Sequence, residues 1–199
     1  LEACGFYDMI LSLKSSSVPV TVRAYKGIAG RVAYPLHLGV TEAGHAESGL
    51  VKSAVGIGAL LLLGIGDTLR VSLTGDPVQE VAAGRDILSA AGLRRFGLEI
   101  VSCPTCGRCG HDLESIVKAV RARLGHVQSP VRVAVMGCVV NGPGEAKGAD
   151  IAFCGGKTGS ALYKKGQFVK RITEDPVPEL LRMIEEHIRE NNEDEQTHA

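Results

Sequence analysis

The chain has 199 residues, of which 45% are hydrophobic and 22% are charged, as is usual for a globular protein with a buried core. Lysine and arginine together number 22, as do aspartate and glutamate, so the formal net charge is zero. This balance excludes recognition of nucleic acid or of a membrane surface through bulk positive charge. The longest apolar run, Ala54–Ile65, is shorter than the about 20 residues of a membrane-spanning helix, so we predict a buried helix there.

No secretory signal pattern opens the sequence. Six cysteines without a secretory context argue against a disulfide framework, and we expect a cytoplasmic protein. The chain begins in the middle of a pattern at Leu1, without an initiator methionine, so we expect it to be a fragment.

Residues 1–97 alternate short apolar runs with helical patterns. We predict strands at Tyr7–Lys14, Tyr34–Val40 and Thr68–Leu73, and a helix that is apolar almost all round at Leu50–Leu63. Strand–helix units in series indicate parallel strands with covering helices. Three parallel strands cannot close a barrel by themselves, which again predicts a fragment.

Two further segments of this half carry helical signals. Val18–Val32 stays open between strand and helix, because β-branched residues favour a strand whereas the spacing of its apolar residues is helical. Asp76 followed by Pro77 predicts the start of a helix. The predicted buried face of that helix consists of Val78, Val81, Ile87 and Leu88.

Residues 98–199 are predicted to form a second, smaller α/β domain. We expect strands at Gly97–Ser102, Val131–Met136 and Ile151–Phe153, then a strand pair within Leu162–Ile172. A helix capped by Asp112 is expected to bury Leu113, Ile116, Val117, Val120 and Leu124. The sequence also predicts a turn at Asn141–Gly144, a final helix with Val177, Leu180, Leu181, Ile184 and Ile188 on one face, and a disordered polar tail from about Asn191.

Four cysteines follow two of the predicted strands. Cys103, Cys106 and Cys109 form a C-x2-C-x2-C run, and Cys138 follows the next strand. Thiolates two residues apart reach one metal centre from a single turn, and a distant cysteine can close the site. Spacing alone favours an iron–sulfur cluster over a structural zinc site, because only one C-x2-C pair typical of zinc ribbons can be formed. Glu145, a harder oxygen ligand, stands seven residues after Cys138.

The two remaining cysteines, Cys4 and Cys154, stand alone and are predicted to be buried, small apolar residues. Three classes of function stay open from the residues alone. They are a reductive enzyme, a non-catalytic electron-transfer module in which Cys109 is the fourth ligand, and a zinc-stabilised scaffold.

Several segments resemble the 4-hydroxy-3-methylbut-2-en-1-yl diphosphate synthase family, which acts in the methylerythritol phosphate route to isoprenoids. The cysteine segments Cys103–Cys106 and Gly137–Glu145 are similar to the family's cluster-binding signatures. Pro35–Gly44 and Gly64–Ser72 resemble its last barrel strands, and the glycines from Gly155 to Gly166 also match. The resemblance extends to about Asn191.

The resemblance implies the last three strands of a (β/α)8 TIM barrel, followed by a complete iron–sulfur domain. It implies a 4Fe-4S cluster bound by Cys103, Cys106, Cys138 and Glu145. Cys109 departs from the family's ligand set. Also implied are ferredoxin or flavodoxin as the electron donor and a homodimer. The substrate would be 2-C-methyl-D-erythritol 2,4-cyclodiphosphate, which is reduced by two electrons to hydroxymethylbutenyl diphosphate.

An anionic diphosphate requires cations and hydrogen-bond donors. Lys14 and Arg70 stand at or near strand ends, where parallel barrels place their active sites, and Arg70 and Ser72 share one side of their strand. Lys14 could equally be a solvated loop lysine, whereas an arginine buried among apolar residues would need a partner. His37 is a further candidate, although a histidine in a strand is more often structural.

Two other residues are predicted to act on the substrate. Glu42 follows a strand and would handle a proton or a hydroxyl, although an acid at a helix N-terminus is common. Asn141 stands between two cluster ligands, and the resemblance implies that it contacts the substrate. A turn residue before Gly142 is the structural alternative for Asn141.

Overall fold

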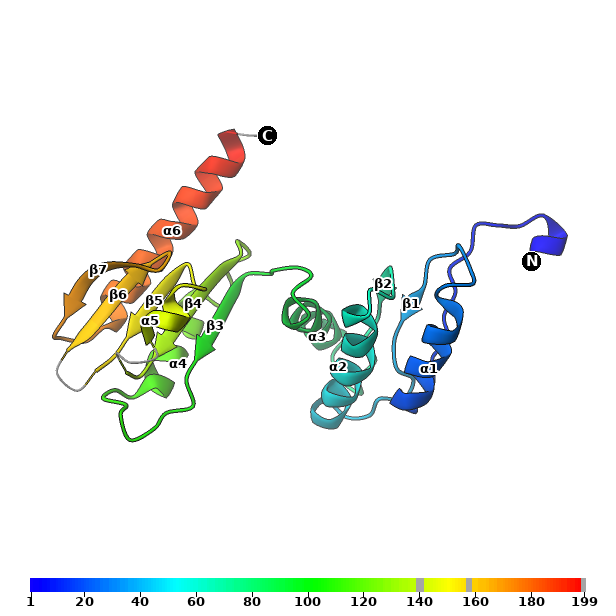
Figure 1. Ribbon diagram of the computed structural model, residues 1–199, viewed down its shortest axis with the longest axis horizontal. Helices are drawn as coiled ribbons and strands as arrows, with labels where there is room; N and C mark the ends of the chain where they lie inside the picture. The colour runs from blue at the N-terminus through cyan, green and yellow to red at the C-terminus, as the bar shows by residue number, and fades with distance from the viewer. Residues whose placement is uncertain (139–141, 157–158, 198–199) are drawn as a thin grey trace. The chain divides into compact units, whose positions relative to one another are not determined.

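The computed structural model describes residues 1–138, 142–156 and 159–197 (Figure 1). The chain divides into two compact units, Leu1–Arg95 and Phe96–Ala199. Both units combine helices with parallel strands, which confirms the α/β class. Within the described residues, no helix is both long enough and apolar enough to cross a membrane.

The first unit contains a short parallel sheet and three long helices. Strands β1 (His37–Leu38) and β2 (Thr68–Leu69) pair in parallel. The helices are α1 (Val18–Ile28), α2 (Ala46–Leu62) and α3 (Pro77–Ala90), preceded by the single 3-10 turn η1 (Glu2–Cys4). The segment left open at Val18–Val32 is therefore a helix, with Pro19 in its first turn, where a missing N–H costs nothing.

The predicted strand at Tyr7–Lys14 does not form. Only Leu11 makes an isolated parallel bridge, to Leu36. The backbone N–H of Leu11 donates to Pro35 O, and that of His37 donates to Leu11 O. Tyr7 and Ile10 are exposed, so this end of the segment has no packing partner within the unit that would extend the pairing into a strand.

The two faces of these short strands differ in chemistry. Leu36, Leu38, Val40 and Val71 are buried against the helices. Side chains alternate along extended chain, so the residues between them, among them Arg70, point to the opposite face. The helices thus cover an apolar face and leave a polar one.

Helix α3 begins as predicted and buries part of its predicted face. The Asp76 carboxylate accepts a hydrogen bond from Val78 N at 2.9 Å. Ile87 is buried and Leu88 packs against the same core, as predicted, but Val78 and Val81 are 71% and 59% exposed, so their predicted burial is wrong. Ala83 and Gly84 complete the buried face, because glycine lets the backbone approach the strand: a Cβ on Gly84 would lie 3.2 Å from Leu69 Cδ1.

Tyr25 connects α1 to the strands through hydrogen bonds of its hydroxyl. Its fully buried hydroxyl accepts from Leu13 N at 3.0 Å and donates to His37 O. Tyr25→Phe should lower the free energy of unfolding by about 1–3 kcal/mol, because Leu13 N loses its partner, whereas His37 O keeps its bond from the Ser12 hydroxyl. Urea unfolding measures this loss. Tyr34→Phe, which removes only an exposed bond to Glu2, should cost about 0.5 kcal/mol or less; equal losses would contradict the expectation.

The second unit is a five-stranded sheet in the order β3-β4-β5-β6-β7. Strands β3 (Leu98–Ser102), β4 (Val131–Met136) and β5 (Ile151–Cys154) are parallel, whereas β6 (Ser160–Lys164) and β7 (Gln167–Ile172) continue the sheet antiparallel. The helices are α4 (Leu113–Leu124), α5 (Gly142–Ala146) and α6 (Val177–Thr197). The predicted strands and the helix capped by Asp112 are confirmed.

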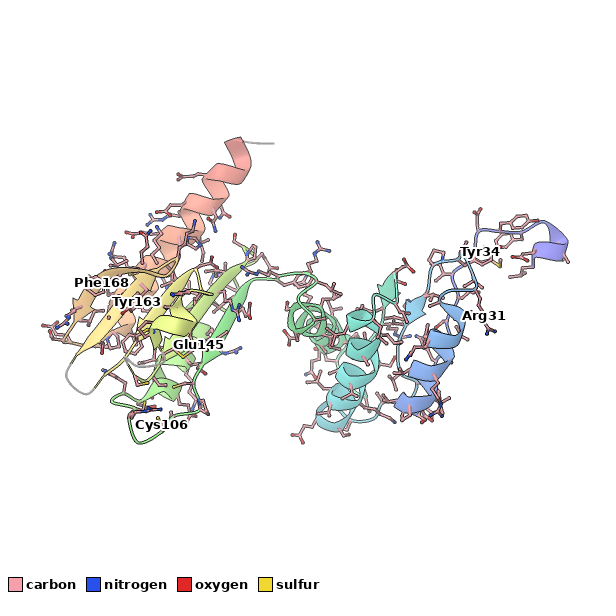
Figure 2. All side chains as sticks on the ribbon, viewed as in Figure 1. Arg31, Tyr34, Cys106, Glu145, Tyr163 and Phe168 are labelled. Carbon is pink, nitrogen blue, oxygen red and sulfur yellow. The ribbon has the colours of Figure 1, made fainter. Side chains whose placement is uncertain are left out.

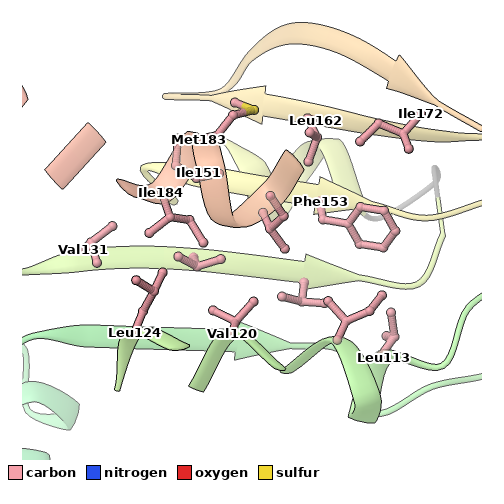
Figure 3. Packing of buried hydrophobic residues seen from close by; sticks show 14 residues of the cluster. Leu113, Val120, Leu124, Val131, Ile151, Phe153, Leu162, Ile172, Met183 and Ile184 are labelled. Carbon is pink, nitrogen blue, oxygen red and sulfur yellow. The ribbon is translucent and has the colours of Figure 1, made fainter. Parts of the chain in front are cut away.

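Side chains alternate between the two faces of the sheet along β4 and β5, and each face packs into a different hydrophobic core. Val131, Val133 and Val135 pack with Ile151 and Phe153 against α4 and α6 (Figure 3). The intervening small residues pack with α5, namely Ala134, Met136, Ala152 and Cys154 together with Ala146 and Ala149. Because both faces are covered, these strands are apolar except at Arg132 near the start of β4, as is typical of parallel sheets.

Two predictions for this unit differ from the structure. Gly142–Gly144 belongs to helix α5 rather than to a turn, which is compatible with Pro143 because the first turn of a helix has unpaired N–H groups. Helix α6 continues through Thr197, past the tail that was predicted to be disordered from Asn191. Side-chain contacts favour this continuation: within the helix, Asn191 Nδ2 lies 3.2 Å from His187 Nε2, and from outside it Ser129 Oγ donates to Asn192 Oδ1 at 2.7 Å.

Candidate functional site

Two of the cysteine segments meet at one edge of the second sheet. Strands β3 and β4 are parallel, with Ser102 opposite Val135. Cys103 and Cys138 therefore leave the sheet at neighbouring carboxyl ends, where open α/β sheets bind their ligands. The backbone N–H of Gly137 donates to Cys103 Sγ at 3.3 Å, so this sulfur already lies beside the segment that carries Cys138.

The loop that follows Cys103 packs on Gly137. Its backbone contact is Gly110 N to Gly137 O at 3.4 Å. A Cβ on Gly137 would lie 2.4 Å from Cys109 Sγ, so only glycine leaves room for that sulfur. Cys103 and Cys109 thus both lie against Gly137. From the sequence, Cys109 was expected either outside the ligand set or as the fourth ligand of an electron-transfer module, and its packing on Gly137 adds a contact that neither expectation specified.

Cys106 lies on the same loop but is exposed (Figure 2). Hydrogen bonds from Arg108 hold the pKa of the Cys106 thiol below its usual value. Arg108 also interacts electrostatically with Cys138. A lowered thiol pKa favours the thiolate, which is the form that binds metal. Thr105, which precedes Cys106, has φ = 52°, a left-handed conformation that is uncommon for threonine and occurs preferentially at functional sites.

The predicted ligand set is only partly assembled. Among the described residues, no three Cys, His, Asp or Glu side chains are close enough to hold a metal ion. Glu145 is exposed on α5 (Figure 2), and Cys106 is exposed on its loop. The chemistry nevertheless fits an iron–sulfur cluster, because soft thiol donors gather at one sheet edge. They pack around Gly137, where the Cβ of any other residue would collide with the Cys109 sulfur. The assignment of Cys103, Cys106, Cys138 and Glu145 as ligands stays a prediction.

The two remaining cysteines behave differently from each other. Cys154 is fully buried beside α5, as predicted, whereas Cys4 is exposed in η1, so its predicted burial is wrong. No residue of η1 is buried. None of the six cysteines, all of which the structure describes, forms a disulfide.

This contrast predicts the order of thiol alkylation in the metal-free protein. Burial raises the pKa of the Cys154 thiol to about 12, so at pH 8 only about one molecule in ten thousand carries the reactive thiolate. Iodoacetamide should modify exposed Cys4 and Cys106 first and Cys154 last, as followed by peptide mass spectrometry. Urea should abolish the difference. Equal rates at Cys4 and Cys154 in the folded protein would contradict this expectation.

A group of cations lies on the polar face of the first unit. A Cβ on Gly39 would lie 2.9 Å from Arg70 O and 2.9 Å from Lys14 Cε, so Lys14 and the Arg70 backbone flank this glycine. Partial burial, followed by the charge of Arg70, lowers the pKa of Lys14. The structure therefore brings together two residues that the sequence predicted to bind an anion. Like charges held close without a counter-anion favour a bound anion.

Arg70 itself is exposed, so the expectation of an arginine buried among apolar residues is wrong. Its neighbours Leu69 and Val71 point toward the helices while Arg70 points away from them. Ser72 follows on the side of Arg70, half-buried, and Glu42 follows β1 at the same end of the sheet. Glu42 has φ = 51°, a strained conformation that is enriched at functional sites. Asn141 lies outside the described residues.

His37 adjoins this cation group. Its Nδ1 lies 2.8 Å from Thr68 Oγ1, across the β1–β2 pair. Burial, then the charges of Lys14 and Arg70, lowers the pKa of His37. His37 was a weaker candidate from the sequence. Its proximity to Lys14 and Arg70 becomes evident only once the pairing of the strands is known.

Comparisons with known proteins match both units. Residues 1–85 match the family model described as the GcpE TIM-barrel domain, and residues 99–187 match the model of the GcpE protein C-terminal domain. The chain belongs to the GcpE family. The barrel assignment of the first unit rests on this match, since the described strands of that unit form only a two-stranded sheet with isolated bridges.

Curated relatives carry one common description, 4-hydroxy-3-methylbut-2-en-1-yl diphosphate synthase (flavodoxin). The chain is 56% identical over 191 residues to the protein of Caldanaerobacter subterraneus subsp. tengcongensis, covering 96% of this chain and 54% of the relative. It is 51% identical to that of Clostridium perfringens (93% and 53%) and 50% identical to that of Thermotoga maritima (92% and 53%). The chain spans about half the length of the curated relatives it matches.

Proposed function

We propose that this chain is the C-terminal portion of an iron–sulfur oxidoreductase of isoprenoid biosynthesis. The reaction is the two-electron reductive ring opening and dehydroxylation of 2-C-methyl-D-erythritol 2,4-cyclodiphosphate to 4-hydroxy-3-methylbut-2-enyl diphosphate. The observation that carries this proposal is the sheet edge at which Cys103, Cys109 and the Cys138 segment meet around Gly137. The description shared by relatives with 50–56% identity supports the same reaction.

The first unit supplies substrate binding in this proposal. Lys14 and Arg70 neutralise the diphosphate, and the planar guanidinium of Arg70 suits two phosphate oxygens at once. Ser72 and Asn141 donate hydrogen bonds to the substrate. The Glu42 carboxylate handles a proton or a hydroxyl at the carboxyl end of β1, where barrel enzymes place catalytic groups.

The second unit holds the cofactor, a 4Fe-4S cluster, through the thiolates of Cys103, Cys106 and Cys138 and the carboxylate of Glu145. When bound, such a cluster supplies single electrons and a Lewis-acidic iron. Glu145 is the weakest of the four ligands because carboxylate is harder than thiolate. Its exposure on α5 allows it to leave the metal without unpacking the core.

Partners and location follow from the same proposal. Flavodoxin, as in the description of the relatives, or ferredoxin delivers the two electrons one at a time. The enzyme works in the cytoplasm as a homodimer. Because the net charge of the chain is zero, we propose that it binds neither nucleic acid nor a membrane surface.

Anaerobic reconstitution of the intact protein tests the cofactor assignment. We expect about four iron and four sulfide ions per chain, with broad visible absorbance. The loaded protein should then consume the cyclic diphosphate in the presence of reduced flavodoxin. Uptake of zinc without sulfide would instead support a zinc scaffold.

The inward position of Cys109 favours one second candidate, a four-cysteine electron-transfer module. Its sulfur lies against Gly137 beside Cys103, whereas Glu145 is exposed. In that case Cys109→Ser would abolish cluster binding and Glu145→Gln would leave it intact. In the enzyme, Glu145→Gln should impair turnover, while Cys109→Ser still binds the cluster, although it holds it less firmly.

A further inference from the structure

A histidine and a serine that are 49 residues apart in the sequence of the second unit meet beside the cysteine loop. His111 Nε2 lies 2.7 Å from Ser160 Oγ, and Ser160, the first residue of β6, is only 3% exposed. A hydrogen bond that replaces water at so buried a hydroxyl is costly to leave unmade. This bond therefore attaches the end of the cysteine loop to the interior of the sheet.

Two further contacts fix the orientation of the imidazole. Its ring meets Phe153 edge to face, with centroids 5.3 Å apart and planes at 83°. A Cβ on Gly155 would lie 2.5 Å from His111 Cδ2, so the ring occupies the space that a larger residue at 155 would fill. The ring is thus held by β5, by the residue after β5 and by β6, all outside its own loop.

The backbone of His111 transmits this anchoring to the sulfurs. Cys109 Sγ donates to the His111 carbonyl at 3.1 Å and lies against Gly137. The same glycine donates its N–H to Cys103 Sγ. One continuous path of contacts thus runs from Ser160 through His111 and Cys109 to the place where Cys103 and Cys138 leave the sheet. The residues between, Pro104 to Arg108, are exposed.

We propose that the His111–Ser160 pair is a positioning pair that holds the cysteine loop in the conformation that binds the cluster. The inference rests on the proposed function, because it presupposes that the cysteines bind a cluster. Neither residue is a ligand. Their effect is to reduce the freedom of the loop before the metal binds, so less ordering is needed when Cys103 and Cys106 take up iron.

The test uses the intact protein, reconstituted anaerobically, and follows the loss of visible absorbance after a chelator is added. Partners that orient metal ligands typically contribute about tenfold to hundredfold in metal affinity, so His111→Phe and Ser160→Ala should release iron at least about tenfold faster. Phenylalanine keeps the ring against Phe153 but removes the bond to Ser160. His111→Gln, which can still hydrogen-bond to the serine, should restore most of the retention.

The double variant distinguishes positioning through the bond from general weakening. If the pair acts through its hydrogen bond, His111→Phe combined with Ser160→Ala releases iron no faster than the single variants. His126→Phe, an exposed histidine of the same unit, is the matched control and should behave as the unaltered protein does. Circular dichroism and thermal unfolding of the metal-free forms verify that the sheet is intact. If His111→Phe does not fold, Ser160→Ala, which deletes one oxygen, decides.

The outcomes separate the inference from the proposed function. An unaltered protein that takes up no iron and sulfide contradicts the proposed function itself. An unaltered protein that binds the cluster, while Ser160→Ala and His111→Phe retain it equally long, contradicts the positioning role alone. Additive losses in the double variant, or no rescue by glutamine, would do the same.

Discussion

Cys138→Ser is expected to abolish cluster binding by the intact protein. The serine hydroxyl is a hard donor that stays protonated at neutral pH, whereas iron in a sulfide cluster requires a thiolate. Cys138 is the only predicted ligand that is nearly fully buried, at 8% exposure, so no water or external thiol can readily take its place. Iron and sulfide content and the visible spectrum after anaerobic reconstitution measure the effect, and we expect less than about a tenth of the unaltered cluster content.

Two matched variants make this result specific. Cys4→Ser alters an exposed cysteine of the first unit and should leave the iron content unchanged. Cys109→Ser alters a sulfur that packs on Gly137 and should reduce retention without abolishing binding. Full cluster content in Cys138→Ser would remove Cys138 from the ligand set, and a loss confined to Cys109→Ser would move the protein to the four-cysteine alternative.

The fold of the second unit was largely predictable because local and tertiary signals agree there. Val131–Met136 was predicted to the residue, since a strand covered on both faces is apolar along most of its length, here everywhere but at Arg132. The first unit was less predictable. The segment Tyr7–Lys14 has the composition of a strand but pairs only at Leu11, and composition cannot show which neighbours a segment lacks.

The errors at the ends of helices have a common physical cause. Val78 and Val81 are apolar and were predicted to be buried, yet the small residues Ala83 and Gly84 provide the close approach to the strands. The polar residues after Asn191 were predicted to be disordered, yet side-chain hydrogen bonds to α6 occur there. In both cases tertiary contacts decide against the local signal, which is apolar character at Val78 and Val81 and polar character after Asn191.

The candidate site was predictable in residue type and only partly in geometry. Spacing identified Cys103, Cys106 and Cys138 and placed two of them at neighbouring strand ends. The inward orientation of Cys109 and the anchoring of His111 by Ser160 depend on contacts with glycines and a distant strand. Single-sequence patterns do not encode such long-range pairings.

Arg70→Ala is expected to weaken binding of the diphosphate substrate by the intact protein about tenfold to hundredfold. A hydrogen bond to a charged group contributes about 1.5–3 kcal/mol. Lys14 and the Arg70 backbone flank Gly39, and the charge of Arg70 acts on Lys14, where the phosphates are proposed to bind. Arg70→Lys should lose less, because it keeps the charge and gives up only the two-pronged geometry. Calorimetric titration with inorganic pyrophosphate, together with KM for the substrate, measures both effects.

Arg31→Ala is the matched control, because Arg31 is exposed in the same unit but precedes β1, at the opposite end of the strand from the carboxyl edge (Figure 2). It should bind pyrophosphate as the unaltered protein does.

The pH dependence gives an independent check. Burial and the charge of Arg70 lower the pKa of Lys14, so removing Arg70 should raise it. The remaining weak binding in Arg70→Ala should then persist to higher pH than in the unaltered protein. Binding by Arg70→Ala equal to that of Arg31→Ala would place the diphosphate elsewhere.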